Sequence, residues 1–276
     1  MPRSLAWATD IDVLPPDRVV ARRDGYLVVR SPSNPSHYFG NLLVFDDPPG
    51  TGDGEHWEEI FRTEFDDERI RHTTFAWDRT DGARGAVAAE FLARGYNADE
   101  SVGLVADAGG VQPHPRENRD VEVRALDPAV GADQELWDAV VELQVAGREE
   151  GHTEADYRSF SRMRLDDRRI LFRAGSGAWY VALDPATGAV AASCGVVVTG
   201  GRGRFQAVDT AAEFRRRGIC SRLLVEAAQR SAELHGAERF VIVADIGYHA
   251  LGLYESLGFE RREHVMAVCR WPRSTT

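Results

Sequence analysis

The stretch that decides the fold is Arg204-Phe-Gln-Ala-Val-Asp-Thr210, which continues through Ala-Ala-Glu-Phe into Arg215-Arg-Arg-Gly-Ile-Cys-Ser221. Residues 204–210 are typical of a strand, and apolar residues at helical spacing predict a long helix over 218–235. A loop that enters a helix presents unpaired backbone N–H groups and the positive end of the helix dipole. The sequence therefore predicts an anion site at residues 215–221, where three arginines add positive potential.

Short strands and helices surround this stretch on both sides. Further strands are predicted over residues 26–30, 41–45, 73–77, 101–106, 121–125, 177–183, 189–199, 239–245 and 264–271. Further helices are predicted over residues 57–65, 85–92, 136–145 and 248–257. Because a turn signal at 184–188 joins two of the strands, 177–199 should form an antiparallel hairpin. The pattern predicts an α/β (α+β) fold, in which mixed, mostly antiparallel sheets are flanked by helices.

Two motifs carry a resemblance to a known family. The loop resembles the acyl-CoA-binding signature of the GNAT acyltransferases, Arg/Gln-x-x-Gly-x-Gly/Ala, and reads Arg215-Arg-Arg-Gly-Ile-Cys220 here. The family's second element, Asn-x-x-Ala-x-x-Leu-Tyr-x-x-x-Gly-Phe, resembles residues 247–259, with Gly247 at the Asn position. Cys220 stands where the family has Gly or Ala. Two motifs in this order and at this separation predict a GNAT-type fold for residues 119–273.

The resemblance implies acetyl-CoA as the co-substrate, with its pyrophosphate held by the loop. Gly218 should let the backbone approach this anion without an intervening side chain. The resemblance also implies that Tyr254 protonates the CoA thiolate as it leaves, and that backbone N–H groups near Asp209 polarise the thioester carbonyl. The residues expected to bind the cofactor are Val208, Asp209, Thr210, Arg215, Arg216, Arg217, Gly218, Ile219, Cys220, Ser221 and Tyr254.

The attacking amine must lose a proton, so a base or a water chain is needed. The first candidate is Asp209, at the end of the strand, and the alternatives are Glu149, Glu150 and His152. For each of them a solvated surface role is the simpler interpretation. The alternation of side chains alone does not say whether Gln206 faces the acceptor cleft.

Two further residues beside the motifs are predicted to be structural. His249 precedes the second motif's alanine, where a capping or surface role is the simpler interpretation. Cys220 lies at a helix N-terminus, but no histidine is adjacent to it in the sequence, so we expect it to contribute packing.

An internal repeat predicts that the chain holds two copies of one fold. Phe91-Leu-Ala-Arg-Gly-Tyr96 resembles Tyr254-Glu-Ser-Leu-Gly-Phe259, and a strand follows each segment. We therefore predict two GNAT-like domains, over residues 1–107 and 119–276, joined by a Gly- and Pro-rich linker over 108–118.

The first copy is expected to be degenerate and non-catalytic. Phe91 lacks the hydroxyl of Tyr254, and the nearest loop candidate, Arg79–Arg84, is followed by too short an interval. Gly82 lies 13 residues before Gly95, whereas the matching interval in the second half is 40 residues, so a helix and a strand should be missing. The polar and aromatic loop Asn34–Asn41 is equally consistent with lining the acceptor site and with a structural turn.

Composition excludes several other functions. The 276 residues carry a net charge of −11, which is unlike a general nucleic-acid binder. All 33 basic residues are arginine, so P-loop, Schiff-base and kinase-type lysines are excluded. The three cysteines and eight histidines show no metal-ligand spacing, and no apolar run is long enough for a signal peptide or a membrane span. We expect a reduced, cytoplasmic protein without metal, and leave open whether it is a homodimer.

The sequence thus predicts an acyl-CoA-dependent N-acyltransferase. It would transfer acetyl from acetyl-CoA to a primary amine of a small molecule or peptide by direct attack. The alternative is a catalytically impaired CoA-binding regulatory or scaffold module. A larger acyl donor such as succinyl-CoA also stays open, because no sequence feature reports the size of the acyl pocket.

Overall fold

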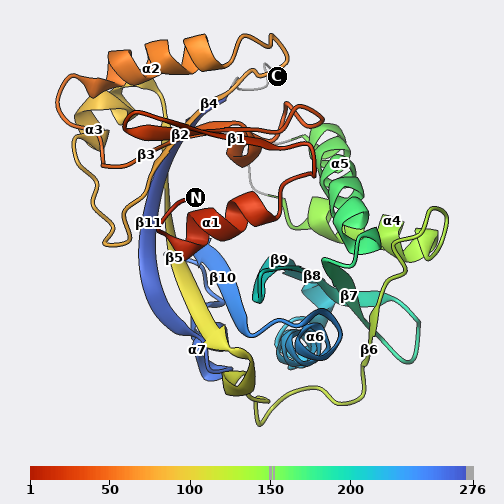
Figure 1. Ribbon diagram of the computed structural model, residues 1–276. Helices are drawn as coiled ribbons and strands as arrows, with labels where there is room; N and C mark the ends of the chain where they lie inside the picture. Colours follow the sequence, from red (N-terminus) through yellow and green to blue (C-terminus); the bar gives the residue numbers. More distant parts are fainter. Residues whose placement is uncertain (149–150, 152, 272–276) are drawn as a thin grey trace. The chain divides into compact units, whose positions relative to one another are not determined.

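The computed structural model describes residues 1–148, 151 and 153–271, which form two compact units (Figure 1). The first unit contains Met1–Gly103, Val243–Tyr248 and residues from 261 onward. The second contains Leu104–Ile242 and His249–Glu260. This division differs from the predicted boundaries, because the last strand pairs with a strand of the first half and so belongs mostly to the first unit. The residues predicted as a linker lie entirely in the second unit.

The first unit is a mixed sheet with the strand order β1-β2-β3-β4-β11-β5. Its strands are β1 (Val19–Arg23), β2 (Tyr26–Arg30), β3 (Leu42–Phe45), β4 (Thr73–Trp77), β5 (Asn97–Asp107) and β11 (Glu260–Arg270). The pair β3–β4 is parallel, and β1–β2, β2–β3 and β4–β11 are antiparallel. A parallel pair needs a crossover, which α2 (Asp53–Glu64) supplies.

The two faces of this sheet carry separate apolar cores. On one face, α2 packs Trp57 against Phe45, with the ring centroids 3.6 Å apart, and Phe91 joins the same aromatic cluster. On the other face, α1 (Leu5–Asp12) packs Trp7 against neighbours that include Leu27. Alternate residues of β2 supply the two clusters, as the period of a strand requires.

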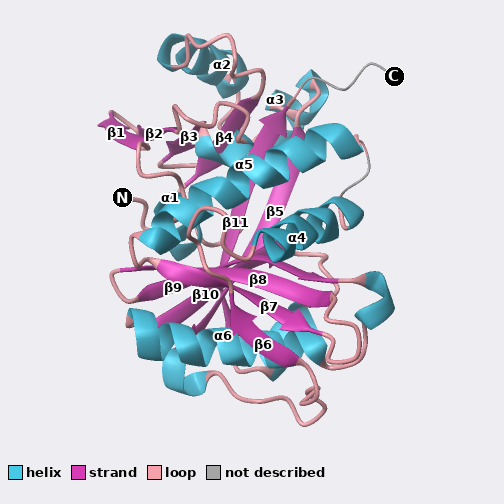
Figure 2. Cartoon of the chain, turned by 90° about the vertical axis from the view of Figure 1, so that its right-hand side faces the viewer, coloured by secondary structure: helices cyan, strands magenta, loops and turns pink. Residues whose placement is uncertain are grey.

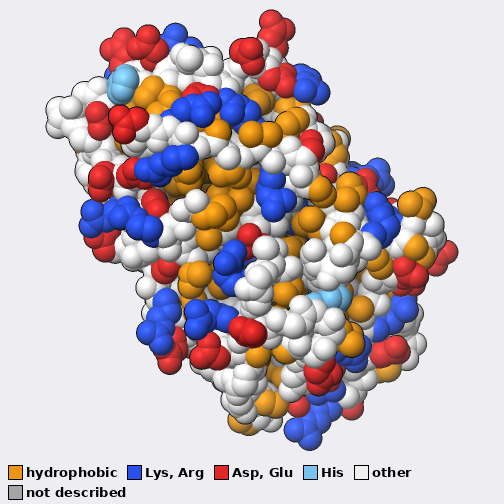
Figure 3. Space-filling model, in the orientation of Figure 1, with side chains coloured by type: hydrophobic (Ala, Val, Ile, Leu, Met, Phe, Trp, Pro, Cys, Tyr) orange, Lys and Arg blue, Asp and Glu red, His pale blue; other side chains and the backbone are white. Residues whose placement is uncertain are grey.

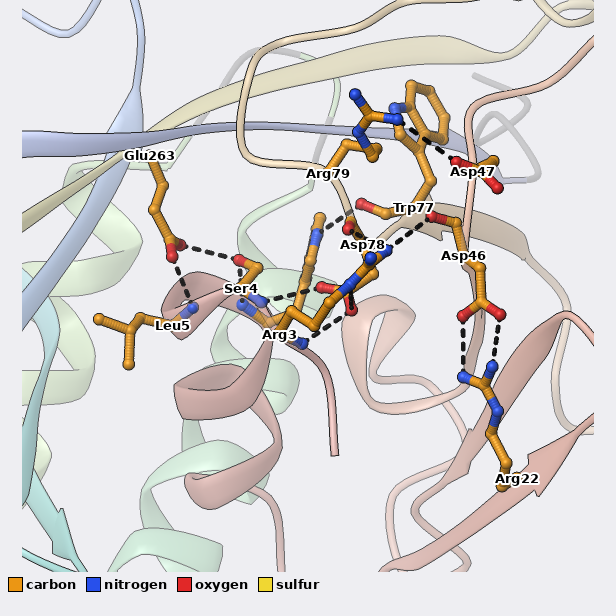
Figure 4. Close-up of polar contacts among 11 residues, drawn as sticks. Arg3, Ser4, Leu5, Arg22, Asp46, Asp47, Trp77, Asp78, Arg79 and Glu263 are labelled. Atoms are coloured by element: carbon orange, nitrogen blue, oxygen red, sulfur yellow. Dashed lines mark hydrogen bonds and ion pairs between the residues drawn. The ribbon is translucent and has the colours of Figure 1, made fainter.

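Two carboxylates hold the start of α1 (Figure 4). Glu263 of β11 accepts hydrogen bonds from Ser4 Oγ at 2.8 Å and Leu5 N at 2.8 Å. It also accepts from Ala6 N at 2.9 Å. Asp78, directly after β4, accepts from the backbone N of Arg3 and of Ser4. Negative charge is favourable at a helix N-terminus, where backbone N–H groups lack partners within the helix. The sequence analysis predicted neither α1 nor β1.

The second unit has the strand order β10-β9-β8-β7-β6. Its strands are β6 (Glu122–Ala125), β7 (Gly177–Leu183), β8 (Val190–Thr199), β9 (Arg202–Thr210) and β10 (Arg239–Asp245). Its helices are α4 (Gln134–Ala146), α5 (Glu154–Arg173), α6 (Ile219–His235) and α7 (Leu251–Ser256). The hairpin β7–β8 is antiparallel as predicted, β8–β9 is antiparallel, and β9–β10 is parallel. Helix α6 covers one face of β7–β9, and α4 and α5 cover the other (Figure 2).

The two units repeat one order of elements. In each, an antiparallel pair is followed by a helix and then by a parallel strand, as β2-β3-α2-β4 and as β8-β9-α6-β10. The short repeat is also seen in the backbone. Tyr96 N donates to Phe91 O at 3.1 Å, and Phe259 N donates to Tyr254 O at 3.2 Å. The intervening glycines have φ values of 83° and 98°.

This order corrects the predicted counterpart of the cofactor loop. Arg79–Arg84 follows β4, so it is not the segment that corresponds to the loop between β9 and α6. That segment is 46–52, between β3 and α2. The helix and the strand expected to be missing are present as α2 and β4. That the first unit is a degenerate copy stays a prediction.

Candidate functional site

A bulge in β9 shapes the strand that leads into the loop. Gly195 of β8 pairs with Gln206, and Ser193 pairs with Asp209, so two steps on β8 match three steps on β9. The additional residue is accommodated where Ala207 has a φ of 42°, a left-handed backbone conformation that few non-glycine residues adopt. A bulge leaves ladder groups of the backbone unpaired. The residues concerned, 207–208, adjoin those predicted to meet the thioester.

The bulge also sets which face Asp209 occupies. In a regular strand, residues three apart point to opposite faces. Here Gln206 accepts a hydrogen bond from Arg168 Nη2 of α5 at 3.2 Å, and Asp209 lies against Gly147 at the end of α4. Both side chains therefore face α4 and α5. Whether this face is the acceptor cleft stays a prediction.

Asp209 lies in a polar cluster under α4 and α5. Arg164 of α5 donates to Gln144 Oε1 at 2.9 Å, and its charge also acts on Asp209. Burial raises the pKa of the Asp209 carboxyl, and the positive charges of Arg164 and Arg215 only partly offset this effect. Its carboxylate is thus a stronger base than that of an ordinary surface aspartate.

On the same face of the sheet, two buried polar atoms lack a hydrogen-bond partner in the described part of the chain. Gln144 Nε2 and Ser193 Oγ, the latter opposite Asp209 in the sheet, have no hydrogen-bond partner among the described residues. Burying such atoms without partners is unfavourable, so they point to a polar ligand or water. The sequence analysis missed Gln144, Arg164 and Ser193. Gln144 was within a predicted helix, but α5 was not predicted at all.

The predicted anion loop leads directly into α6. Arg215, Arg216 and Arg217 are exposed, whereas Ile219 and Ser221 are buried. Arg215 Nε donates to Thr210 O at 3.2 Å, and the guanidinium of Arg217 lies 5.2 Å from the centre of the Phe214 ring. The first-turn N–H groups of a helix have no partners within the helix. The loop therefore combines exposed positive charge with backbone donors.

The structure gives a reason for Gly218 other than the predicted one. Its φ is 74°, and a Cβ placed on it would lie 2.0 Å from Arg116 O. The close neighbour is thus the segment before β6, in addition to any bound anion. Glycine is required here even without a ligand.

Cys220 is a packing residue rather than a nucleophile. Burial raises the pKa of its thiol to about 12, and a hydrogen bond with Thr210 offsets this effect only in part. At neutral pH the side chain is therefore a neutral thiol. This agrees with the structural role that the sequence analysis assigned to it.

Tyr254 is buried, with 2% of its surface exposed. It lies in α7, where its backbone N donates to Ala250 O at 3.1 Å. The proposed general acid is therefore part of the packing of the second unit. Its role in catalysis stays a prediction.

The other predicted candidates fall into two groups. Glu149, Glu150 and His152 lie outside the described residues. The loop Asn34–Asn41 is held by hydrogen bonds of its own: Asn41 accepts from Ser31 N at 2.9 Å and donates to Asn34 O at 2.9 Å. These bonds join the two ends of the loop. That it lines the acceptor site stays a prediction.

The corresponding loop of the first unit is closed by carboxylates. Gly52, the N-cap of α2, has a φ of 92°, close to that of Gly218 at the N-cap of α6. Its N–H and that of Gly54 donate to the two oxygens of Glu90, at 2.9 and 3.1 Å. Asp46, which opens the segment, is paired with Arg22 (Figure 4). An internal carboxylate thus takes the donors that a bound anion would use.

Comparison with protein families gives a match over the site. Residues 137–259 match the model of the acetyltransferase (GNAT) family. The match includes β9, the loop, α6 and Tyr254. Residues 137–259 are therefore similar to the GNAT family of acetyltransferases. No curated protein matches the chain.

Solved structures share the fold over nearly the whole chain. A GCN5-related N-acetyltransferase from Kribbella flavida is 16% identical, with a TM-score of 0.63 over 97% of this chain and 96% of its own. A conserved protein of unknown function from Staphylococcus epidermidis is 13% identical, with a TM-score of 0.69 over 92% and 94%. A tandem GNAT protein from the clavulanic acid biosynthesis pathway is 16% identical, with a TM-score of 0.55 over 95% and 87%. At these identities the likeness is one of fold.

Two further properties concern the part of the chain that the structure describes. None of its helices is both long and apolar enough to cross a membrane. In the same residues, no group of three or more His, Cys, Asp or Glu side chains could hold a metal ion. Acidic and arginine side chains are interspersed over the surface seen in Figure 3.

Proposed function

We propose that the second unit transfers an acetyl group from acetyl-CoA to a primary amine of a small molecule or peptide. The observation that carries this proposal is the bulge in β9, which directs Asp209 into a polar cluster one short loop before the N-terminus of α6. In this proposal a base and an anion site lie along one continuous strand, loop and helix. The GNAT family match over the same residues supports the proposal.

In this proposal the loop 215–221 holds the pyrophosphate of acetyl-CoA. The helix N-terminus supplies backbone donors, and Arg215–Arg217 add positive charge. The thioester would lie along the bulged part of β9, where backbone N–H groups of 208–210 polarise its carbonyl oxygen. Acetyl-CoA is a co-substrate, because the reaction transfers its acetyl group to the amine.

The chemical step is direct attack. Asp209, directly or through water, takes a proton from the ammonium form of the acceptor. The neutral amine nitrogen then bonds to the thioester carbon, and the carbon–sulfur bond breaks. Tyr254 gives its phenolic proton to the departing thiolate. The nitrogen of the new C–N bond loses its extra proton to the Tyr254 phenolate, directly or through water, so the products are an amide and free CoA, and Asp209 keeps the proton it took from the ammonium group. Asp209 and Tyr254 are the catalytic residues of this proposal.

The acceptor site would be the polar cluster under α4 and α5. Ser193 Oγ and Gln144 Nε2 offer hydrogen bonds to a polar acceptor, and Asp209 offers a negative charge to its ammonium group. The net charge of −11 favours approach of a cationic amine in a general way.

The proposal is tested by assaying CoA release from acetyl-CoA with a panel of small and peptide amines. Tyr254→Phe should lower kcat about 10²-fold or more if Tyr254 is the acid. Unchanged turnover of this variant across pH would remove Tyr254 from the mechanism. Acetyl-CoA binding without transfer to any amine would favour the alternative, a CoA-binding regulatory or scaffold module. The same assay with succinyl-CoA tests the larger acyl donor.

A further inference from the structure

The segment before β6, residues 108–118, makes two close contacts with the GNAT motifs. A Cβ on Gly218 of the loop would lie 2.0 Å from Arg116 O, and a Cβ on Gly258, at the end of α7, would lie 2.2 Å from Gly110 O. Both glycines have positive φ values. The glycines of both motifs are therefore needed because the same segment passes against them. A freely moving linker would not impose such a requirement.

Backbone hydrogen bonds fix this segment at both contacts. Near its start, Gln112 N donates to Leu257 O at 2.9 Å. At its other end, Asn118 N donates to Gly218 O at 3.0 Å, and Arg222 N of α6 donates to the same oxygen at 3.3 Å. In a planar trans peptide the C=O and the following N–H point in opposite directions. Fixing the carbonyl of Gly218 therefore also fixes the N–H of Ile219, which is one of the donors expected to meet the pyrophosphate.

The segment itself is stiff where it approaches the loop. Pro113 and Pro115 restrict the backbone on either side of His114. Arg116 N donates to His114 Nδ1 at 3.0 Å, and Glu117 N donates to His114 O at 2.9 Å. A stiff segment can hold the loop in one conformation before a ligand arrives.

One buried side chain connects the segment to α6. Glu117 has a side chain that is 3% exposed, and its Oε1 lies 3.0 Å from Arg119 Nε and 3.7 Å from Arg222 Nη1. Arg222 belongs to the first turn of α6 and also pairs with Glu226 at 2.6 Å. A buried carboxylate that loses its arginine partners is strongly destabilising, so the ion pairs of Glu117 favour the observed position of the segment. Glu117 thus secures the segment against the helix that carries the anion loop.

We propose that residues 108–118 are a brace for the cofactor loop, with Glu117 as its positioning residue. The inference rests on the proposed use of acetyl-CoA. The brace keeps the peptide between Gly218 and Ile219 in the orientation that presents its N–H to the pyrophosphate. Binding then does not have to order the loop, which lowers the cost of binding.

The test compares Glu117→Gln with Glu142→Gln in the full chain. Glu142 pairs with Arg158 at 2.8 Å on α4 and α5, so the control removes a carboxylate from another arginine pair of the same unit. Titration calorimetry with acetyl-CoA should show a Kd about tenfold higher for Glu117→Gln, and an unchanged Kd for Glu142→Gln. Arg222→Gln, which removes the arginine of the Glu117–Arg222 pair from α6, should also raise the Kd. At saturating acetyl-CoA, kcat of Glu117→Gln should stay within about twofold of the wild type.

Two results would overturn the brace. An unchanged Kd for Glu117→Gln would show that the ion pair does not position the loop. A lower Kd would show that the carboxylate acts only by repelling the pyrophosphate, because removal of a nearby negative charge favours an anion.

Hydrogen exchange separates failure of the brace from failure of the proposed function. Without any ligand, the amides of Asn118 and of residues 219–221 should exchange faster in Glu117→Gln than in the wild type and in Glu142→Gln. If wild-type protein does not bind acetyl-CoA, the proposed function is wrong, and the exchange rates still decide the brace. Equal rates in all three proteins would mean that residues 108–118 do not hold the loop.

Discussion

At the scale of single residues, burial of the Asp209 carboxylate lowers the stability of the folded protein at neutral pH and also makes the carboxylate a stronger base. Its pKa is raised by burial, so the folded protein binds the proton more tightly than the unfolded chain does. Stability contributed by this group is therefore lost as the pH rises through its ordinary range and above. The same burial gives a carboxylate whose basicity is closer to that needed near neutral pH.

We predict that Asp209→Asn moves stability and activity in opposite directions. At pH 7 its Tm should rise, because burial favours the uncharged amide over the carboxylate. Its kcat/KM should fall about 10²-fold or more, since the base is removed. Thermal denaturation and a pH–rate profile check the two expectations, with Asp138→Asn on the exposed face of α4 as the control. A wild-type profile whose acidic limb lies at the ordinary aspartate pKa, about 4, would contradict the assignment.

At the scale of secondary-structure elements, the sequence predicted those whose residues alternate or repeat in a regular way. The strands 26–30, 73–77, 177–183 and 239–245 are found with the predicted bounds, and α6 begins one residue after its predicted start. Helix α5 was missed because charged side chains, several of them arginine, fill half of its sequence, so its apolar face is narrow. Helix α1 was missed because its N-terminal donors are satisfied by Glu263, a residue far away in the chain.

The sequence likewise predicted some residues of the candidate site and not others. The loop and Tyr254 were found from short motifs, whereas the cluster around Asp209 was found only in part. The bulge at Ala207 decides which face Asp209 occupies, and it arises from the pairing of β9 with β8. Gln144, Arg164 and Ser193 meet Asp209 from three other elements, so no local pattern connects them. The burial of Tyr254 is likewise a property of the packed unit.

At the start of α2, a single side chain decides whether the helix N-terminus is available. Glu90 accepts from Gly52 N and Gly54 N, and these two hydrogen bonds lower the pKa of its carboxyl. A lowered pKa means that its contribution to stability is present above the ordinary range of glutamate and is lost as the pH falls through the lowered value.

We predict that Glu90→Gln lowers the Tm modestly at pH 7. The difference from the wild type should shrink below about pH 4, where the wild-type carboxyl takes up a proton. Thermal denaturation at a series of pH values checks this, with the exposed Glu55→Gln of the same helix as the control. A difference that does not depend on pH would show that Glu90 acts through its packing and not through its charge.

At the scale of the whole molecule, the two units repeat one order of elements with opposite outcomes at the corresponding helix. In the second unit, α6 is preceded by three exposed arginines, and the brace fixes the first-turn donors in position. In the first unit, α2 is preceded by Asp46, Asp47 and two prolines, and Glu90 takes the donors at its N-terminus. The repetition of the fold therefore does not imply repetition of the proposed cofactor site.

We predict that one chain binds one equivalent of acetyl-CoA. Titration calorimetry with the full chain should give a stoichiometry near one, and Arg215→Ala combined with Arg217→Ala should remove that binding because the loop loses two of its three charges. Asp46 and Glu90 place negative charge where the first unit would need to accept a pyrophosphate, so no second site should appear even at high ligand concentration. A second equivalent that persists in the double variant would show that the first unit binds the cofactor by other residues. Binding that survives the double variant at unchanged affinity and a stoichiometry of one would instead move the site away from the loop before α6.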